Sequence, residues 1–362
     1  MTCQSWKTIR LGAHCAKIGS GATPRGGESV YQETGVSFIR SQNVYNGQFS
    51  LDGLAYLDDE QADQLKGVTV ESGDILLNIT GDSVARSCRV PDEVLPARVN
   101  QHVAIIRPKP EEFDSRFVGY FFISPFMQDT MLSLAGSGGT RKALTKEMIE
   151  RFEVPQPPCS IQRRIADILS GYDDLIENNR RRITLLEEAA RQLYREWFVR
   201  LRFPGHEHTR ITDGVPEGWE RAPFEAALVL QRGFDLPVQD RKDGDVPIYG
   251  STGINGFHSM AKVLGPGVVT GRSGTLGEVQ YVSSDFWPLN TCLWVKEFKR
   301  VSPVFAVFLI REMDLRQYNG GVSVPTLDRK TVHKAEILIP TRRLITTFDE
   351  FAEPLFQQIN TL

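Results

Sequence analysis

The longest regular pattern of apolar positions spans residues 160–200. Apolar or ring-bearing residues recur there in steps of three and four, with one glycine, Gly171, and no proline. This spacing predicts one long helix, and its near-heptad seam is typical of a helix that packs against another. Ser160 fits the N-cap position after Pro157-Pro158, because proline is excluded from a helix interior. The helix over residues 160–200 would be about 60 Å long at 1.5 Å per residue, and the helical region is assigned to residues 158–203.

Shorter patterns on either side of this helix predict two α/β regions. Apolar runs bounded by Gly and Pro predict strands at Ser37–Ile39, Asp74–Ile79 and His102–Arg107, and periodic segments predict helices at Phe117–Leu134 and Thr145–Arg151. Pro and Gly then mark a linker over 204–218, before a second α/β region at 219–340 and a helix at 341–362. The predicted class is α/β (α+β), with a first domain at 1–157, a second at 219–340, and long helices between and after them.

The two α/β regions carry matching segments in the same order, which indicates a tandem duplication. Asn100–Ala104 aligns with Asn290–Trp294, Phe117–Ile123 with Val304–Ile310, and Ser72–Leu76 with Pro266–Val269. At one constant offset, Leu144, Ile149, Val154 and Pro157 recur as Leu327, Val332, Ile337 and Pro340. At a second constant offset, Arg163-Arg164-Ile165, Leu169 and Ile176 recur as Arg342-Arg343-Leu344, Phe348 and Leu355.

The repeat supplies a partner for the long helix, because the last helix carries the same apolar seam. We expect the two helices to pair as an antiparallel coiled coil about a pseudo-twofold axis. The expected contacts are Ile165, Leu169, Tyr172, Ile176, Asn179, Leu186, Leu193 and Trp197 on the first helix, and Leu344, Phe348, Phe351 and Leu355 on the second. Asn179 either fixes the register as a buried polar residue or lies at the edge of the seam. Since nothing in the last helix matches 184–203, we expect Leu186, Leu193 and Trp197 to need cover from another subunit.

Composition limits the function classes only moderately. A net charge of −3 means that any basic surface for nucleic acid must be local or supplied by a partner. Five scattered cysteines without a Cys-x-x-Cys pair indicate reduced thiols in the cytoplasm rather than a disulfide frame or a zinc site. No apolar run is long enough to span a bilayer.

Catalytic motifs do not stand out. The glycine-rich loop 136–142 lacks the phosphate-binding spacing of a P-loop, and no glycine fingerprint follows a strand to hold a nucleotide or S-adenosylmethionine. His206 and His208 fit a solvated loop better than a metal site, and Arg180-Arg181-Arg182 fits a solvated helix face better than a DNA contact. We therefore expect no catalytic residue and no metal on this chain.

Polar loops of small residues remain as candidate binding elements in both regions. Arg, Asn and Gln side chains read base edges by hydrogen bonding, although turns use the same residue types. The candidate DNA-binding residues in the first region are Thr23, Arg25, Arg40, Gln42, Asn43, Asn78, Thr80, Arg86, Gln101, Ser137, Arg141 and Lys142. In the second region they are Arg232, Tyr249, Ser251, Asn255, His258, Arg272, Ser273 and Thr275.

Taken together, these segments resemble the specificity (S) subunit of type I restriction-modification systems. The most specific part is Pro155–Leu169, PQPPCSIQRRIADIL, continued by Asp174–Asn179 and by Leu193–Phe198. Gly19–Pro24, Gly73–Leu76 and Tyr249–Ile254 resemble signatures of target recognition domains.

The resemblance implies a subunit without catalytic activity that reads double-stranded DNA. Each α/β region would read one half of a split target, and the helices would set the spacer between the halves. Methyltransferase (M) subunits that use S-adenosylmethionine to methylate adenine N6, and motor-nuclease (R) subunits that use ATP and Mg²⁺, would be the partners, so this chain would bind no cofactor itself. Two alternatives stay open, a stand-alone DNA-acting hydrolase or nuclease and a structural coiled-coil scaffold.

Overall fold

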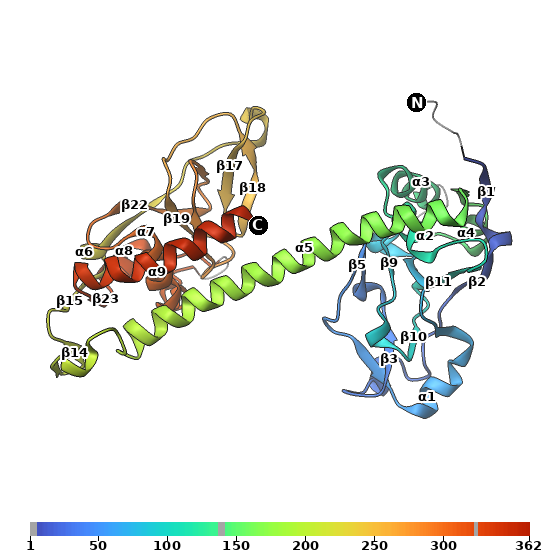
Figure 1. Cartoon of the computed structure of the whole chain (residues 1–362), viewed down its shortest axis with the longest axis horizontal. Helices are drawn as coiled ribbons and strands as arrows, with labels where there is room; N and C mark the ends of the chain where they lie inside the picture. The colour runs from blue at the N-terminus through green and yellow to red at the C-terminus, as the bar shows by residue number, and fades with distance from the viewer. Residues whose placement is uncertain (1–5, 137–141, 322–324) are drawn as a thin grey trace. The chain divides into compact units, whose positions relative to one another are not determined.

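The structure is a computed structural model that describes residues 6–136, 142–321 and 325–362. The chain forms two compact units, which we call unit 1 (to Leu175) and unit 2 (from Ile176). The boundary falls inside the longest helix, α5 (Cys159–Tyr194), which continues as one π-helical turn at Arg195–Val199 (Figure 1). Each unit has its own sheets and core, so each is described by itself.

Unit 1 is built around a four-stranded sheet of order β2-β11-β8-β9, whose neighbours are all antiparallel. These strands are β2 (Cys15–Ser20), β11 (Val103–Pro108), β8 (Ile75–Asn78) and β9 (Ser87–Arg89). A second sheet, of order β6-β3-β10-β7, contains the parallel pair β3–β10. It comprises β6 (Ala55–Leu57), β3 (Val36–Ile39), β10 (Ala97–Val99) and β7 (Thr69–Val70). The smaller elements of unit 1 are β1 (Thr8–Arg10) with β12 (Glu153–Pro155), β4 (Val44–Tyr45) with β5 (Gln48–Phe49), α1 (Asp59–Gln64), α2 (Ser115–Phe122), α3 (Pro125–Gly136) and α4 (Lys146–Glu150).

Strand β8 shows why the first sheet is the middle layer of unit 1. Ile75 and Leu77 pack in the cluster that includes the buried side chains of α2 and α3, whereas Leu76 packs in the cluster with Ile39 and Val99 of the second sheet. Both faces of the strand are therefore buried, which explains its continuous apolar sequence instead of an alternating one.

The single helix expected at Phe117–Leu134 is two helices, α2 and α3. Pro125 has no N–H to donate to the preceding turn, so α2 ends at Phe122 and Pro125 opens α3, where a proline is tolerated. The Ser124 hydroxyl donates to the Phe121 carbonyl at 2.6 Å, which caps the break. The prediction of a single helix is wrong because it followed the apolar periodicity across Pro125.

Unit 2 repeats this architecture with the sheet order β16-β22-β19-β20, again all antiparallel. Its strands are β16 (Leu228–Arg232), β22 (Cys292–Phe298), β19 (Gly267–Gly271) and β20 (Val279–Val282), with β18 (Gly253–His258), β17 (Val246–Gly250) and β21 (Trp287–Pro288) in a second sheet. The pairs β15 (Glu220–Pro223) with β23 (Glu336–Ile339) and β13 (Ile211–Thr212) with β14 (Val215–Pro216), and the helices α6 (Phe224–Ala227), α7 (Pro303–Glu312), α8 (Arg329–Lys334) and α9 (Arg342–Thr361), complete it. The identical strand order, and the parallel pair β17–β21 in place of β3–β10, confirm the internal repeat.

The strand register corrects one detail of the repeat. Leu77 lies opposite Ala104, and Val269 lies opposite Trp294, the residue that aligns with Ala104. Leu77 therefore matches Val269, and the expected match of Gly73 with Gly267 is wrong by two residues. A slip of two keeps every side chain on its original face, so the apolar pattern could not reveal it.

Helix α9 packs antiparallel to the last turns of α5 within unit 2. Phe348, near the start of α9, contacts Tyr194 and Trp197 near the end of α5, with ring centroids 5.8 and 6.1 Å apart. At the other end of α9, the Asn179 side-chain amide donates to the Leu362 carbonyl at 3.4 Å. Phe348 has no exposed surface. This packing confirms the antiparallel pairing that the two apolar seams predicted.

The expectation that Leu186, Leu193 and Trp197 would need another subunit is wrong. Leu186 is half-buried, Leu193 packs against the unit 2 core, and Trp197 is 7% exposed. An antiparallel partner that starts beside residue 197 covers the end of α5, so the turns left without cover lie before residue 179. On those turns the expected seam residues Leu169, Tyr172 and Ile176 are 37%, 62% and 49% exposed.

The first turns of α5 are anchored to unit 1 by a buried glutamine from the specific PQPPCSIQRRIADIL segment. Gln162 is fully buried, and its amide nitrogen donates to the Pro157 and Glu112 carbonyls at 2.8 and 3.1 Å. Its amide oxygen accepts from the Asp114 N–H at 3.0 Å. Ala166, one turn later, is buried in the same core, and Ile165 packs against it.

Candidate nucleic-acid interface

A polar groove of about 460 Å³ lies in unit 1 where β8 ends and β11 begins. We call it the Thr80 groove. It is lined by Ser41, Gln42, Tyr45, Thr80, Gly81, Asp82, Ser83, Arg86 and His102. Three of these, Gln42, Thr80 and Arg86, are residues that the sequence predicted to contact DNA, and Gln101 adjoins them through its neighbour His102. Loops that are far apart in the chain therefore converge at one end of the central sheet.

Two predicted contact residues hold this groove together from inside. Asn78 is fully buried, and its amide nitrogen donates to the Ser41 carbonyl at 2.8 Å and the Val44 carbonyl at 3.3 Å. Asn43 is also fully buried, where its amide nitrogen donates to the Ser50 and Asp52 carbonyls. Since both amides are enclosed, we correct their assignment from DNA contact to positioning of the residue 41–45 segment.

The exposed side chains of the groove offer both hydrogen-bond donors and stacking surfaces. The Arg86 guanidinium lies over the ring of Tyr45 at 4.9 Å, and Tyr45 is 43% exposed. The Thr80 hydroxyl is 2.7 Å from Nδ1 of His102, and the Gln101 amide nitrogen is 3.4 Å from Nε2. A guanidinium held on a ring keeps its outer N–H groups aimed in one direction, which suits bidentate contact with a guanine edge or a phosphate.

The sequence list omitted Tyr45 and His102. Each is two residues or fewer from a selected residue, Asn43 or Gln101, and both carry groups that stack on or hydrogen-bond to bases. Their omission follows from choosing amide and guanidinium side chains and ignoring aromatic rings beside them.

The other candidates of unit 1 are dispersed. Thr23 and Arg25 are exposed after β2, and Lys142 is exposed while its carbonyl accepts from the Gly81 N–H at 3.2 Å. Arg40 is turned inward, because it donates to the Gly53 carbonyl at 2.7 Å and lies 5.3 Å from the centre of the Tyr31 ring. Ser137 and Arg141 lie outside the described residues.

In unit 2, the β19–β20 loop occupies the place that the β8–β9 loop has in unit 1. It carries Arg272, Ser273 and Thr275, and the Arg272 guanidinium donates to the Asn290 carbonyl at 3.2 Å. Among the other candidates, Arg232 and Asn255 are exposed, while Ser251 and Tyr249 are half-buried. Burial raises the pKa of the Tyr249 hydroxyl.

His258 cannot read DNA from its position. It is 5% exposed, its Nδ1 accepts from the Lys242 N–H at 3.0 Å, and its ring packs edge-on against Trp287 at 5.3 Å. We therefore correct its assignment to a structural histidine of unit 2. Its position next to a run of glycine and polar residues made it look like part of the loop.

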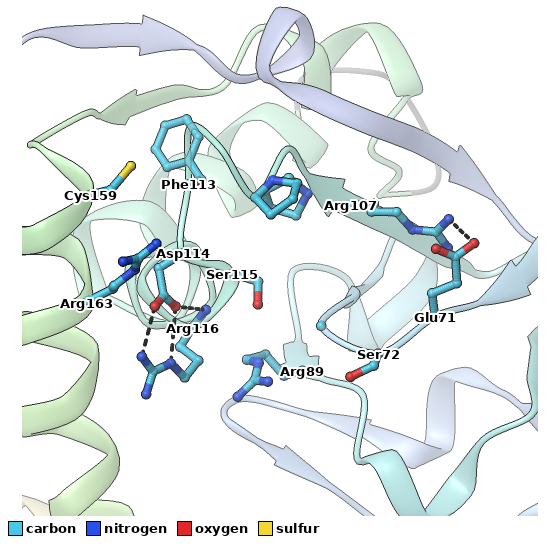
Figure 2. Close-up of a pocket in the computed structure, with 13 residues that line it drawn as sticks. Glu71, Ser72, Arg89, Arg107, Phe113, Asp114, Ser115, Arg116, Cys159 and Arg163 are labelled. Atoms are coloured by element: carbon cyan, nitrogen blue, oxygen red, sulfur yellow. Dashed lines mark hydrogen bonds and ion pairs between the residues drawn. The ribbon is translucent and has the colours of Figure 1, made fainter.

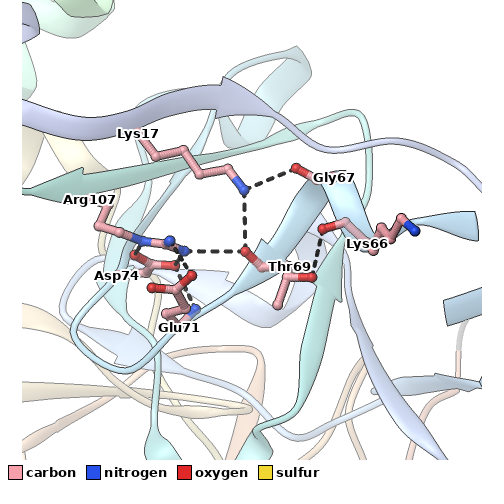
Figure 3. Close-up of polar contacts among 7 residues, drawn as sticks. All are labelled: Lys17, Lys66, Gly67, Thr69, Glu71, Asp74 and Arg107. Atoms are coloured by element: carbon pink, nitrogen blue, oxygen red, sulfur yellow. Dashed lines mark hydrogen bonds and ion pairs between the residues drawn. The ribbon is translucent and has the colours of Figure 1, made fainter. Parts of the chain in front are cut away.

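A buried ion pair fixes the opposite end of β8 (Figure 3). The Asp74 carboxylate has no exposed surface, and it accepts from Nε and Nη2 of Arg107 at 2.7 and 2.8 Å. Arg107 also pairs with Glu71, and Lys17 donates to the Gly67 and Thr69 carbonyls at 3.0 and 3.3 Å. The hydrogen bonds that Arg107 donates to the Asp74 carboxylate raise the pKa of Arg107, as expected for a bidentate pair. This pair explains the Gly-Asp-Ile-Leu signature as a structural element.

The described residues contain no cluster of three or more His, Cys, Asp and Glu that suits a metal ion, and none of their helices is long and apolar enough to cross a membrane. Burial raises the pKa of the Cys88 and Cys292 thiols to about 12, so neither is a nucleophile near neutral pH.

A family model described as "Type I restriction modification DNA specificity domain" matches residues 4–188 of the chain. The chain belongs to this family. The type I DNA specificity family thus accounts for unit 1, where the Thr80 groove lies, and for the start of unit 2, and it gives the chain a role in DNA recognition.

Relatives and solved structures agree with this assignment. The chain is 24% identical over 292 residues to the type I restriction enzyme MjaIX specificity subunit of Methanocaldococcus jannaschii, covering 73% of this chain and 67% of that one. It is 27% identical over 199 residues to a putative type I restriction enzyme MjaX specificity subunit of the same organism, of whose length the match spans 42%. The crystal structure of a type I S subunit from M. genitalium has the same fold, with a TM-score of 0.63, 14% identity, and coverage of 100% of this chain and 92% of that one.

Proposed function

We propose that this member of the type I DNA specificity family is a DNA-reading subunit that catalyses no reaction itself. Unit 1 would read one half of a split, asymmetric target, and unit 2 would read the other half. The observation that carries this proposal is the repeat of one sheet order in both units, with a polar loop at the same sheet end in each, at β8–β9 and β19–β20.

The differences between these loops support an asymmetric target. The β8–β9 loop presents Thr80 and Arg86, whereas the β19–β20 loop presents Arg272, Ser273 and Thr275. Because base edges are distinguished by patterns of donors and acceptors, unlike loops are expected to select unlike sequences. Helix α5, with 36 residues, would set the spacer between the half-sites.

The exposed turns of α5 support the proposed partners. Ile168, Leu169, Tyr172 and Leu175 are between 37% and 62% exposed along one helix of unit 1. A row of large apolar side chains is costly to leave in water and marks a protein interface. We propose that adenine-N6 methyltransferase subunits cover it, that they hold S-adenosylmethionine, and that motor-nuclease subunits supply the ATP- and Mg²⁺-dependent steps in the cytoplasm.

The test is to express the chain with its methyltransferase subunit in a host without DNA methylation and to map N6-methyladenine across the genome. The expected result is one split, asymmetric motif with a fixed spacer. A complex that is shown to assemble but leaves no such motif would refute the proposed function.

A further inference from the structure

The β17–β18 hairpin of unit 2 carries two large apolar side chains that are more than half exposed. Ile254 is 56% exposed and Phe257 is 54% exposed, although both belong to strand β18. This strand is the first in the sheet order β18-β17-β21, so one of its edges has no partner strand among the described residues. Large apolar groups left in water on an edge strand mark a surface that binds a partner.

A β-bulge places both apolar side chains on one face of the strand. Ile254 lies opposite Tyr249 and Phe257 lies opposite Pro247, so β18 has one residue more than β17 between these two pairs. Residues three apart normally face opposite sides of a strand, and the extra residue brings Ile254 and Phe257 to the same side. Gly256, with a φ of +111°, supplies the left-handed backbone conformation inside the bulge.

Asn255 lies between the two apolar side chains, and Arg241 holds it in place. The Arg241 guanidinium donates through Nη1 to the Asn255 carbonyl at 2.6 Å and through Nη2 to Oδ1 at 3.1 Å. The Nε of Arg241 is buried, so Arg241 acts on a ligand through Asn255. Asn255 is exposed, and its amide nitrogen has no hydrogen bond among the described residues. The amide can therefore donate from its nitrogen while its oxygen keeps one lone pair to accept.

The hairpin adjoins the β19–β20 loop of unit 2. A Cβ added to Gly271 in that loop would lie 3.0 Å from the Ser251 carbonyl in the hairpin turn, and the next residue of the loop is Arg272. The turn also follows the parallel pair β17–β21, as the residue 41–45 segment of the Thr80 groove follows β3–β10. Asn255 and its apolar neighbours therefore continue the surface that the β19–β20 loop presents to DNA in the proposed function.

This set of groups matches an A·T base pair in the major groove. The groove admits a two-stranded β-ribbon, Asn forms two hydrogen bonds with N6 and N7 of adenine, and apolar side chains contact the thymine methyl group. A G·C pair has no methyl group in the major groove, so it would leave Ile254 and Phe257 without an apolar contact.

We propose that the β17–β18 hairpin of unit 2 reads an A·T base pair. Asn255 hydrogen-bonds to the adenine, Ile254 and Phe257 pack against thymine methyl groups, and Arg241 is the positioning residue for Asn255. The inference deepens the proposed function and rests on it, because unit 2 must read one half of the target.

The first experiment tests the apolar contact. The full chain with its methyltransferase subunit selects duplexes from a random pool by binding, and Asn255→Ala shows which half of the selected motif belongs to the hairpin. Duplexes with thymine or uracil in that half are then compared, because uracil lacks only the methyl group. The probe variants are Ile254→Ala and Phe257→Ala, singly and together, and the control is Ile211→Ala, which shortens a side chain of β13 that is 47% exposed.

The parent complex is expected to bind the thymine duplex about fourfold more tightly than the uracil duplex, which is the effect of burying one methyl group. The double variant should bind the two duplexes equally, whereas Ile211→Ala should keep the parent ratio. A hairpin that had only lost stability would bind both duplexes more weakly and would leave their ratio unchanged. An unchanged ratio in the double variant therefore overturns the inference.

The second experiment tests the role of Arg241. Asn255→Ala is expected to relax one A·T position of the selected motif, and Arg241→Met should relax the same position. Because Arg241 acts through Asn255, the double variant should relax the motif no further. The matched control is Arg163→Met, which should leave the motif unchanged. Figure 2 shows Arg163 on α5, beside a cavity of unit 1 at the sheet end opposite the Thr80 groove.

The remaining outcomes separate the inference from the proposed function. An Asn255→Ala complex that selects the parent motif, or that relaxes only a G·C position, overturns the inference. Apolar variants that bind the methyltransferase subunit more weakly but keep the thymine–uracil ratio also overturn it, by assigning the β18 edge to a protein partner. A split motif with equal binding of thymine and uracil overturns the inference alone, whereas a parent complex that selects no sequence overturns both.

Discussion

Units 1 and 2 build the same sheet with different groups at matching positions. Counting from the pair Leu77 and Val269, Asn78 matches Thr270 and Asp74 matches Pro266. The matched polar side chains Asn78 and Thr270 are both buried, at 0% and 1% exposure. The ion pair of unit 1 has no such match, because Pro266 carries no charge and, after a β-bulge in the β16–β22 pair, the apolar Phe298 takes the place of Arg107. The strand order thus depends on the apolar pattern, and the ion pair is an addition of unit 1.

The largest expected difference between the units concerns their helices. Phe348 of α9 and Leu169 of α5 occupy matching repeat positions, but Phe348 is fully buried and Leu169 is 37% exposed. Phe348→Ala should lower the free energy of unfolding of unit 2 by about 3–5 kcal/mol, because it leaves a cavity among Tyr194, Phe305 and Phe308. Leu169→Ala should cost unit 1 less than about 1 kcal/mol. Hydrogen exchange followed by segment measures both, and equal losses would contradict the difference in burial.

The ion pair provides the next test. Arg107→Met should destabilise unit 1 by about 3 kcal/mol, because it leaves the buried Asp74 carboxylate without its partner. Glu297→Gln, which removes an exposed charge from β22 of unit 2, should have an effect within about 0.5 kcal/mol. Exchange rates of the β8 and β11 amides, compared with those of β19 and β22, report each unit separately. A double variant, Asp74→Ala with Arg107→Met, should recover much of the loss; if it is no more stable than the single variant, the explanation by an unpaired charge is wrong.

The β8–β9 loop of unit 1 and the β19–β20 loop of unit 2 are expected to contribute to DNA recognition independently. Arg86→Ala in unit 1 and Arg272→Ala in unit 2 should each weaken specific binding by about 1–3 kcal/mol if they contact base edges. Each should also relax the methylated motif in only one half. Sequencing of N6-methyladenine from cells that carry each variant shows which half changes. Equal relaxation of both halves by one substitution would argue against separate readers.

The smallest expected effect is a pH dependence of the stability of unit 2. Burial raises the pKa of Asp349 on α9 to about 6, while the Ser302 hydroxyl donates to it at 2.7 Å and opposes the shift. A carboxyl with a raised pKa binds its proton more tightly when folded, so its contribution to stability is full below pH 4 and is lost as the pH rises through 6. Asp349→Asn should remove this slope from the unfolding of unit 2. Unit 1 has Ser170 at the matching position and should show no such slope, which pH-resolved hydrogen exchange can check.

Much of the fold could be predicted from the sequence because it rests on patterns of burial. The long helix, the repeat and the antiparallel pairing of the two helices all follow from apolar spacing. The antiparallel arrangement also decides which end of α5 is covered. Matching the two repeats residue by residue instead predicted that residues 184–203 would lack cover, and this prediction is wrong. The break at Pro125 and the two-residue slip at Gly267 depend on local hydrogen bonds and strand register, which the apolar period does not contain.

The candidate site was less predictable, because the direction of a side chain decides its role. Asn43, Asn78 and His258 have the residue types of DNA contacts but are enclosed by their own units. Gln42, Thr80 and Arg86 lie in one groove, and Asn78 ties the loop that carries Gln42 to β8. The residue type is the same whether the side chain faces inward or outward, so composition alone does not separate a buried residue from a DNA contact.

The hydrogen bond between Asn179 and Leu362 places the two ends of unit 2 side by side. Within unit 2, α9 therefore runs back along α5, so that residue 362 lies beside the turn of α5 that carries Asn179. A domain whose ends meet can be cut at a surface turn and rejoined at those ends without rebuilding its core. A circular permutant that joins residue 362 to residue 176 through a short glycine linker should therefore keep the β16-β22-β19-β20 sheet.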